Sequence, residues 1–295
     1  MLEKIKNKNI LKKIFRQLKE VSYLRILKYN KQLKKRLNIS KSQYEGYYKI
    51  ELELKIYPMS FGNCRFINIK DKDKLFYHFY SGKKEIKHNY ITNKSKIRKI
   101  KVIIDKKVNS FKGLFKNCKS IKEIKIIKFN RKNILDMSEM FAGCSFLTKL
   151  NSEKIITNNV QDMSNMFDGC TSLVSLNLSN FNTSNVVDMD YMFYRCNKLK
   201  KLEISNFDTS KVTYMRKMFY ECFLLEELDL SNFDTSNITD MECLFFGCES
   251  LKTIKGINNL NTNKVIKMND MFYGCSSLLN VDTCKFKDIK QIKNF

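Results

Sequence analysis

The sequence of 295 residues contains a single proline, Pro58, only nine glycines and no tryptophan. So little proline and glycine excludes collagen-like architectures and Pro/Gly-rich linkers. No apolar run approaches the roughly 20 residues that a membrane-spanning helix needs. Hydrophobic residues nevertheless make up 43% of the chain and aromatic residues 12%, which is enough to build a core and excludes a wholly disordered chain.

Residue types and motifs for catalysis are also scarce. There are two histidines, His78 and His88, and the sequence contains no nucleophile elbow, Walker loop, dinucleotide fingerprint or zinc signature. We therefore expect a protein that is not an enzyme, with no catalytic residues, no metal ligands and no cofactor.

The N-terminus is basic, but no apolar segment of the kind found in secretory signal peptides follows it. This pattern predicts a cytoplasmic, reducing location. Ten cysteines in a reduced chain are then core residues, metal ligands or catalysts.

Positive charge is concentrated in the first half of the chain. Residues 1–150 contain 39 Lys and Arg against 12 Asp and Glu, a net charge of +27, whereas residues 151–295 contain 16 against 18, a net charge of −2. This division predicts two regions with different surfaces. Tyr and Phe interleave the lysines, but no nucleic-acid-binding motif is present, so a solvated basic surface is favoured over a nucleic-acid partner.

A repeat of 26 residues dominates the rest of the sequence. Six cysteines recur at this spacing and a seventh follows after 27 residues, each with Phe three positions before it and Met or Leu before the Phe. These marker cysteines are Cys118, Cys144, Cys170, Cys196, Cys222, Cys248 and Cys275. A period of this length indicates a solenoid, in which each unit buries its apolar face against its neighbours.

Each unit is predicted to combine a short strand, a polar turn and a short helix. Met215 and Met218 follow Val212 at helical spacing, whereas Leu228 and Leu230 alternate as in a strand. Gly or Asn precedes the marker cysteine in five units, which suits a left-handed residue at a helix end. Because Arg195 and Glu221 take this place in the other two units, the left-handed cap is expected to be optional.

The pattern LxxLxLSNFDTSxVxxMxxMFxxC resembles the leucine-rich repeats of the BspA-like surface-protein family, which also occur in mycoplasmas and microbial eukaryotes. The resemblance covers residues 108–286 and is most specific in the segments Ser205-Asn206-Phe207-Asp208-Thr209-Ser210 and Ser231-Asn232-Phe233-Asp234-Thr235-Ser236. It implies an α/β solenoid at residues 108–295, a leucine-rich-repeat horseshoe of about seven units. It also implies a cell-surface location as the alternative to the cytoplasm.

In such a stack the marker cysteines form a ladder of small buried side chains, and we expect them to be structural. A metal site would need clustered ligands that include His, and neither histidine lies in the repeats. The Asn/Asp-Thr-Ser turns are interpreted as uncharged ladders rather than calcium sites, because a carboxylate occurs only at Asp208 and Asp234.

The region before the repeats is predicted to have a helical part at residues 1–45 and a β-rich part at residues 46–107. The helical part, with apolar residues such as Ile10, Phe15 and Leu18 on one face, faintly resembles an F-box, a module that docks an adaptor of ubiquitin ligases. Its Leu-Pro opening is missing, and a plain helical cap or basic arm is the favoured interpretation. The β-rich part is either a small domain or a degenerate continuation of the repeats.

Four β segments are expected in the β-rich part: residues 48–56, 66–69, 76–80 and 99–104.

The preferred function is protein–protein recognition. In leucine-rich repeats the side chains between the strand leucines line the concave face, the usual recognition surface. The positions selected here are Asn177, Glu203, Glu226, Glu227, Asp229 and Lys255. Their acidic centre favours a partner with a basic patch, or self-association with the basic half of the chain. The alternative functions are substrate recognition for a ubiquitin ligase through the F-box-like segment, and surface adhesion as in the bacterial relatives.

Overall fold

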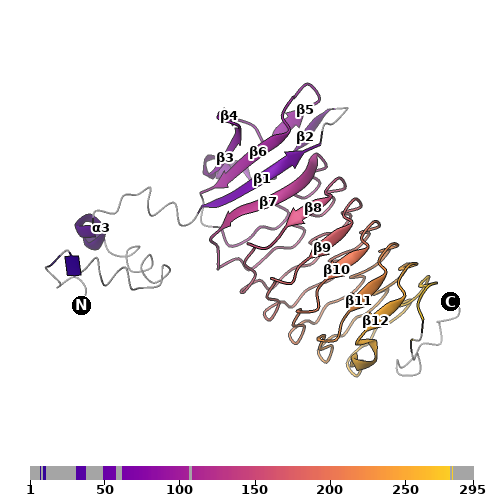
Figure 1. Cartoon of the computed structure of the whole chain (residues 1–295). Helices are drawn as coiled ribbons and strands as arrows, with labels where there is room; N and C mark the ends of the chain where they lie inside the picture. The colour runs from indigo at the N-terminus through magenta and orange to yellow at the C-terminus, as the bar shows by residue number, and fades with distance from the viewer. Residues whose placement is uncertain are drawn as a thin grey trace. The chain divides into compact units, whose positions relative to one another are not determined.

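The computed structural model describes residues 7, 9–10, 31–37, 49–57, 62–105, 108–279 and 281, and the chain divides into two compact units, Met1–Lys49 and Ile50–Phe295 (Figure 1). In the first unit, helix α3 (Lys31–Leu37) buries Leu33 and Leu37. This helix lies within the part predicted to be helical. Most of that part, including Phe15 and Leu18, lies outside the described residues.

The second unit is made mostly of strands and turns. Its first six strands are β1 (Ile50–Ile56), β2 (Asn63–Arg65), β3 (Tyr77–Ser81), β4 (Lys84–Ile86), β5 (Tyr90–Thr92) and β6 (Lys99–Ile104). The repeats supply β7 (Ile121–Phe129), β8 (Lys149–Asn151), β9 (Ser175–Asn177), β10 (Lys201–Glu203), β11 (Glu227–Asp229) and β12 (Thr253–Lys255). Two short 3-10 helices, η2 (Asp71–Phe76) and η3 (Ile257–Asn259), complete the described elements.

Strand β1 joins the β-rich part to the repeats. Its alternating sequence places Ile50, Leu52, Leu54 and Ile56 in the core, as period-two patterning predicts. It pairs antiparallel with both β6 and β7, and β7 pairs parallel with β8, in a sheet of order β4-β3-β6-β1-β7-β8. One sheet therefore crosses the predicted domain boundary at residue 107.

Three of the four β segments predicted before the repeats are found, as β1, β3 and β6. The prediction of a strand at residues 66–69 is wrong. Phe66 and Ile67 are fully buried in a bend, and the neighbouring β2 pairs instead with β5. The apolar residues of this segment are buried without forming a strand. A short apolar run in a sequence does not distinguish a buried bend from a buried strand.

The prediction of a short helix in each repeat is also wrong, and so is the α/β class that depends on it. Residues 108–279 contain no α-helix. The backbone N–H groups of Met137, Glu139 and Phe141 each donate to a carbonyl of the next repeat at 2.9 Å. An α-helix needs these donors within its own segment. The segment therefore folds as successive turns that pair with the neighbouring repeat.

A left-handed residue precedes every marker cysteine. The φ angle is 54° at both Arg195 and Glu221, close to the 64° of Gly169, so the prediction that this conformation is optional is wrong. The stack holds it, because Arg195 N and Glu221 N donate to Tyr220 O and Phe246 O at 2.8 and 2.7 Å.

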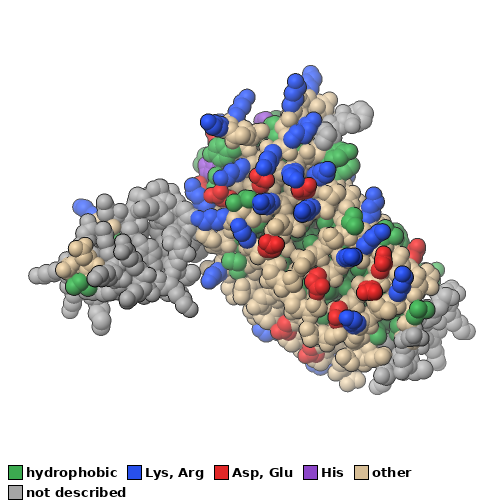
Figure 2. Space-filling view, in the orientation of Figure 1, with side chains coloured by type: hydrophobic (Ala, Val, Ile, Leu, Met, Phe, Trp, Pro, Cys, Tyr) green, Lys and Arg blue, Asp and Glu red, His purple; other side chains and the backbone are tan. Residues whose placement is uncertain are grey.

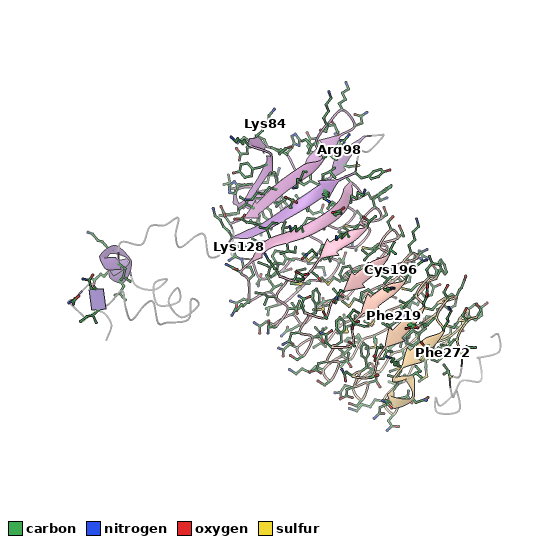
Figure 3. All side chains as sticks on the ribbon, in the orientation of Figure 1. Lys84, Arg98, Lys128, Cys196, Phe219 and Phe272 are labelled. Atoms are coloured by element: carbon green, nitrogen blue, oxygen red, sulfur yellow. The ribbon has the colours of Figure 1, made fainter. Side chains whose placement is uncertain are left out.

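Equivalent side chains of successive repeats form ladders in the core. The rings of the marker phenylalanines stack with centroids 5.3–5.7 Å apart and planes within 15° of one another. Figure 3 labels Phe219, Phe272 and Cys196 along this stack. The seven marker cysteines are at most 1% exposed, which confirms that they are buried. From Cys144 onward each thiol donates to a Phe carbonyl of the preceding repeat, for example Cys222 Sγ to Phe193 O at 3.2 Å.

The polar turns are joined by a second, hydroxyl ladder. Thr183 and Thr209 are buried, and their Oγ1 atoms donate to Asp208 O and Asp234 O of the next repeat at 2.9 and 2.8 Å. The exposed Asp208 carboxylate accepts from the backbone N–H and hydroxyl of Ser210. The turn carboxylates thus close their own turns, in agreement with a structural interpretation of these segments.

No helix among the described residues has the length and apolar character required to cross a membrane.

Candidate recognition surface

The residues selected from the sequence lie on or beside four consecutive repeat strands, β9 to β12, which form two parallel pairs. Asn177 ends β9, Glu203 ends β10, and Lys255 ends β12, and all three are exposed. Glu227 begins β11 and is exposed, while Asp229 ends it and is half-buried. Glu226 is exposed but precedes β11, so it is beside the row rather than in it. We call Asn177, Glu203, Glu227, Asp229 and Lys255 the strand-face row.

Parallel pairing brings members of the strand-face row side by side. Glu203 is the register partner of Asn177, and Lys255 is the partner of Asp229. Lys255 Nζ lies 3.7 Å from Asp229 Oδ2. Because this pair is largely exposed, its contribution to stability is small. Glu203 and Glu227 form no ion pair within the described part of the chain, so the centre of the row keeps an uncompensated negative charge.

Several of these side chains also close the turn that follows their strand. Asn177 Oδ1 accepts from Ser179 N at 2.9 Å, and Asp229 Oδ1 accepts from Ser231 N at 3.0 Å. Ser205 donates its hydroxyl to Glu203. Hydrogen bonds from Ser231, and then the charge of Lys255, hold the pKa of the Asp229 carboxyl below its usual value. These hydrogen bonds hold Asn177, Glu203 and Asp229 in place within the row.

The sheet next to the first repeats carries a different charge pattern. Cross-strand pairs compensate the carboxylates of β1 and β7, with Lys99 Nζ at 2.8 Å from Glu53 and Lys55 Nζ at 2.6 Å from Glu123. Figure 2 shows Lys and Arg side chains crowded over this end of the visible face, with acidic side chains more frequent along the later repeats. The charge division of the sequence is thus visible as two ends of one unit.

The last repeats contain a second aromatic ladder, which was not predicted from the sequence. Tyr194, Tyr220, Phe246 and Tyr273 stack with ring centroids 4.7–4.9 Å apart. The guanidinium carbon of Arg195 lies 4.9 Å from the centroid of the Tyr194 ring. All four rings are partly exposed. Each of these aromatic residues directly follows a marker phenylalanine, so the sequence does show that they recur. Recurrence of one aromatic residue per repeat does not by itself show that the rings stack.

Isolated parallel bridges between successive repeats bring several aspartates next to one another. Parallel bridges join Asp136 to Asp162 and Asp162 to Asp188. Burial raises the pKa of Asp190 to about 6, with a further contribution from the nearby charges of Asp188 and Asp240. In the described part of the chain, no group of three His, Cys, Asp or Glu side chains is arranged to hold a metal ion.

Two solved structures are similar to this chain. A leucine-rich repeat protein from Bacteroides ovatus ATCC 8483 has 18% identity, covering 63% of this chain and 72% of its own, with a TM-score of 0.18. A leucine-rich repeat protein from T. pallidum has 18% identity, covering 54% of this chain and 84% of its own, with a TM-score of 0.24. No curated protein matches the sequence.

A protein family described as "Mycoplasma protein of unknown function, DUF285" matches residues 84–201, 146–227 and 195–295. Together these segments run from residue 84 to residue 295 and cover more than half of the chain, and so the protein belongs to the DUF285 family.

Proposed function

We propose that this protein is a non-enzymatic recognition module that binds another protein through the strand-face row of a leucine-rich-repeat solenoid. The observation that carries the proposal is the parallel pairing of β9 with β10 and of β11 with β12. Asn177, Glu203, Asp229 and Lys255 each end one of these four strands. A repeated, largely exposed row provides an extended surface, as repeat proteins use for binding.

The expected partner carries a basic patch. Glu203 and Glu227 lack ion-pair partners among the described residues, and electrostatic attraction of this kind speeds association more than it deepens affinity. A second copy of the chain, presenting its lysine-rich end, is the alternative partner.

The test begins with a photo-crosslinking amino acid placed at Glu227 in the source cell, with Glu249 as the control position. Both side chains are exposed, but Glu249 lies in a turn outside the strand-face row. We expect a partner to be captured at 227 and not at 249. Equal capture at the two positions would argue against the row. Recovery of the chain itself identifies self-association.

The second step uses the triple variant Glu203→Gln, Glu227→Gln, Asp229→Asn. These changes remove three charges and keep the acceptor oxygens that close the turns. We expect slower association with the captured partner, a weaker dependence of its rate on salt, and an unchanged unfolding midpoint. Association rates that stay the same across a range of salt concentrations would show that the partner binds elsewhere.

The identity of the captured proteins also separates the finer alternatives. Adaptor and cullin subunits would support a ubiquitin-ligase receptor that docks through the F-box-like segment. Recovery of the protein in a membrane or wall fraction would support the surface adhesin, and recovery in the soluble fraction the cytoplasmic location.

A further inference from the structure

A pocket of about 490 Å³ lies between the β2 segment and the turns of the first repeat. Its lining includes Cys64, Arg65, Asn68, Gly113, Lys116 and Lys119. Its volume falls within the range of roughly 300–1,000 Å³ that small-molecule sites occupy. The strand-face row contributes none of these residues, so the pocket is a separate feature of the unit.

The two walls of the pocket are fastened to each other. Asn68 Nδ2 donates to Gly113 O at 2.9 Å and to Lys116 O at 2.7 Å, and Asn68 N donates to Leu114 O at 2.8 Å. Ser120 Oγ donates to Arg65 O at 3.3 Å. Because one side chain bonds the backbone of the opposite wall twice, the pocket is formed before a ligand binds. Preformed sites avoid the entropic cost of ordering their walls.

The lining has the chemistry of an anion site. Its charged residues are Arg65, Lys116 and Lys119, its amides come from asparagines, and no carboxylate lines it. Lys116 pairs with Glu139, which stands outside the lining. Arg65 and Lys119 form no ion pair within the described part of the chain.

We propose that this pocket binds a small ligand through a phosphate group. Two cations outside any described ion pair match the charge of a phosphate monoester better than that of a single carboxylate. The guanidinium of Arg65 presents a planar fork of donors suited to phosphate oxygens, and Lys119 supplies a point charge. The pocket is larger than a phosphate ion, so the remainder of a phosphorylated small molecule fits beside the charged wall.

The thiol of Cys64 provides a local reporter. It is a free cysteine that lines the pocket and is half-buried, whereas the other described cysteines are buried. A neutral alkylating agent such as iodoacetamide will label it, and peptide mass spectrometry separates this label from one on any other cysteine. Occupation of the pocket slows labelling of Cys64 and leaves the other cysteines unaffected.

The experiment titrates the full-length protein with inorganic phosphate, with sodium chloride at matched ionic strength as the reference. We expect phosphate to slow Cys64 alkylation in a saturable manner, with acetate protecting much less. Absence of protection at millimolar phosphate, equal protection by chloride, or equal protection by acetate would each overturn the phosphate assignment.

Variants locate the site. Arg65→Gln and Lys119→Gln are each expected to weaken the phosphate affinity derived from protection by about tenfold or more, because each removes a charge-assisted hydrogen bond. The matched control is Lys125→Gln, which removes the same charge from an exposed position on β7. A control variant that weakens binding as much as the pocket variants would show attraction by overall charge and refute a defined site.

Discussion

At the residue scale, Gly256 occupies a position that tolerates no side chain. Its φ is 77°, and an added Cβ would lie 2.6 Å from Ser231 Cα and 2.7 Å from Ser231 N of the preceding repeat. We expect Gly256→Ala to reduce the free energy of unfolding by about 2–4 kcal/mol, through left-handed strain and a backbone clash. Urea denaturation measures the change. The control is Gly82→Ala, because Gly82 has a φ of 59° but an added Cβ there would have no atom within 4 Å. An equal loss of unfolding free energy in the two variants would show that the backbone clash at Gly256 does not contribute.

The marker cysteines are specified by a hydrogen bond as well as by size. Phe193 O accepts from Cys196 N at 3.1 Å and from Cys222 Sγ at 3.2 Å. We expect Cys222→Ala to cost about 1–3 kcal/mol, and Cys222→Ser to cost less because its hydroxyl keeps a donor for the carbonyl. Chemical denaturation of both variants provides the comparison. A serine variant less stable than the alanine variant would show that the thiol acts only by filling space.

At the element scale, the two aromatic ladders differ in burial and so in energy. Phe219 is 0% exposed between the rings of Phe193 and Phe245, whereas Tyr220, the next residue, is partly exposed. We expect Phe219→Ala to cost about 3–5 kcal/mol. Tyr220→Ala should cost clearly less, because part of its surface is already in water. Equal losses in denaturant titrations of the two variants would contradict the assignment of the inner ladder as the core.

The partly buried Asp190 is expected to make stability depend on pH. The folded pKa of Asp190 is about 6, above its ordinary value of 3.8, because burial disfavours the charged form. A carboxyl with a raised folded pKa binds its proton more tightly in the folded state, so unfolding free energy should rise as pH falls from about 7 towards 4. Asp190→Asn should flatten this dependence in urea titrations across that range. An unchanged slope in the variant would assign the effect to other groups.

At the scale of the whole molecule, the buried thiols set an alkaline limit. Burial raises the pKa of Cys144, Cys222 and Cys275 to about 12. Once pH exceeds the unfolded pKa near 9, the unfolded state ionises and the folded state does not, so each thiol removes about 1.4 kcal/mol of stability per pH unit. We expect the urea midpoint to fall steeply above that pH, and less steeply in Cys222→Ala. A midpoint that stays constant there would mean that the thiols titrate in the folded protein.

Much of the second unit could be predicted from the sequence, because the same apolar residues recur at the same positions in every repeat. Seven marker cysteines with their phenylalanines indicated the ladder core, and alternation in residues 48–56 predicted β1. The row around Glu203 and Asp229 was likewise expected from its place between strand leucines, and the structure puts both at equivalent strand ends. Its role in binding stays a prediction.

The period, the identity of the buried ladders and the separation of charge can be predicted from the sequence, because they follow from side-chain chemistry repeated at equal spacing. The backbone conformation between the ladders depends on contacts between repeats and is seen only in the folded structure. Met215 and Met218 have helical spacing, yet Lys217 adopts φ of 54° and its N–H donates to Glu242 O of the next repeat. The same apolar spacing is compatible with a helix and with a stacked turn. The two differ in which carbonyl accepts from each backbone N–H. Here the acceptor lies in the next repeat, and a pattern within one repeat contains no information about that hydrogen bond.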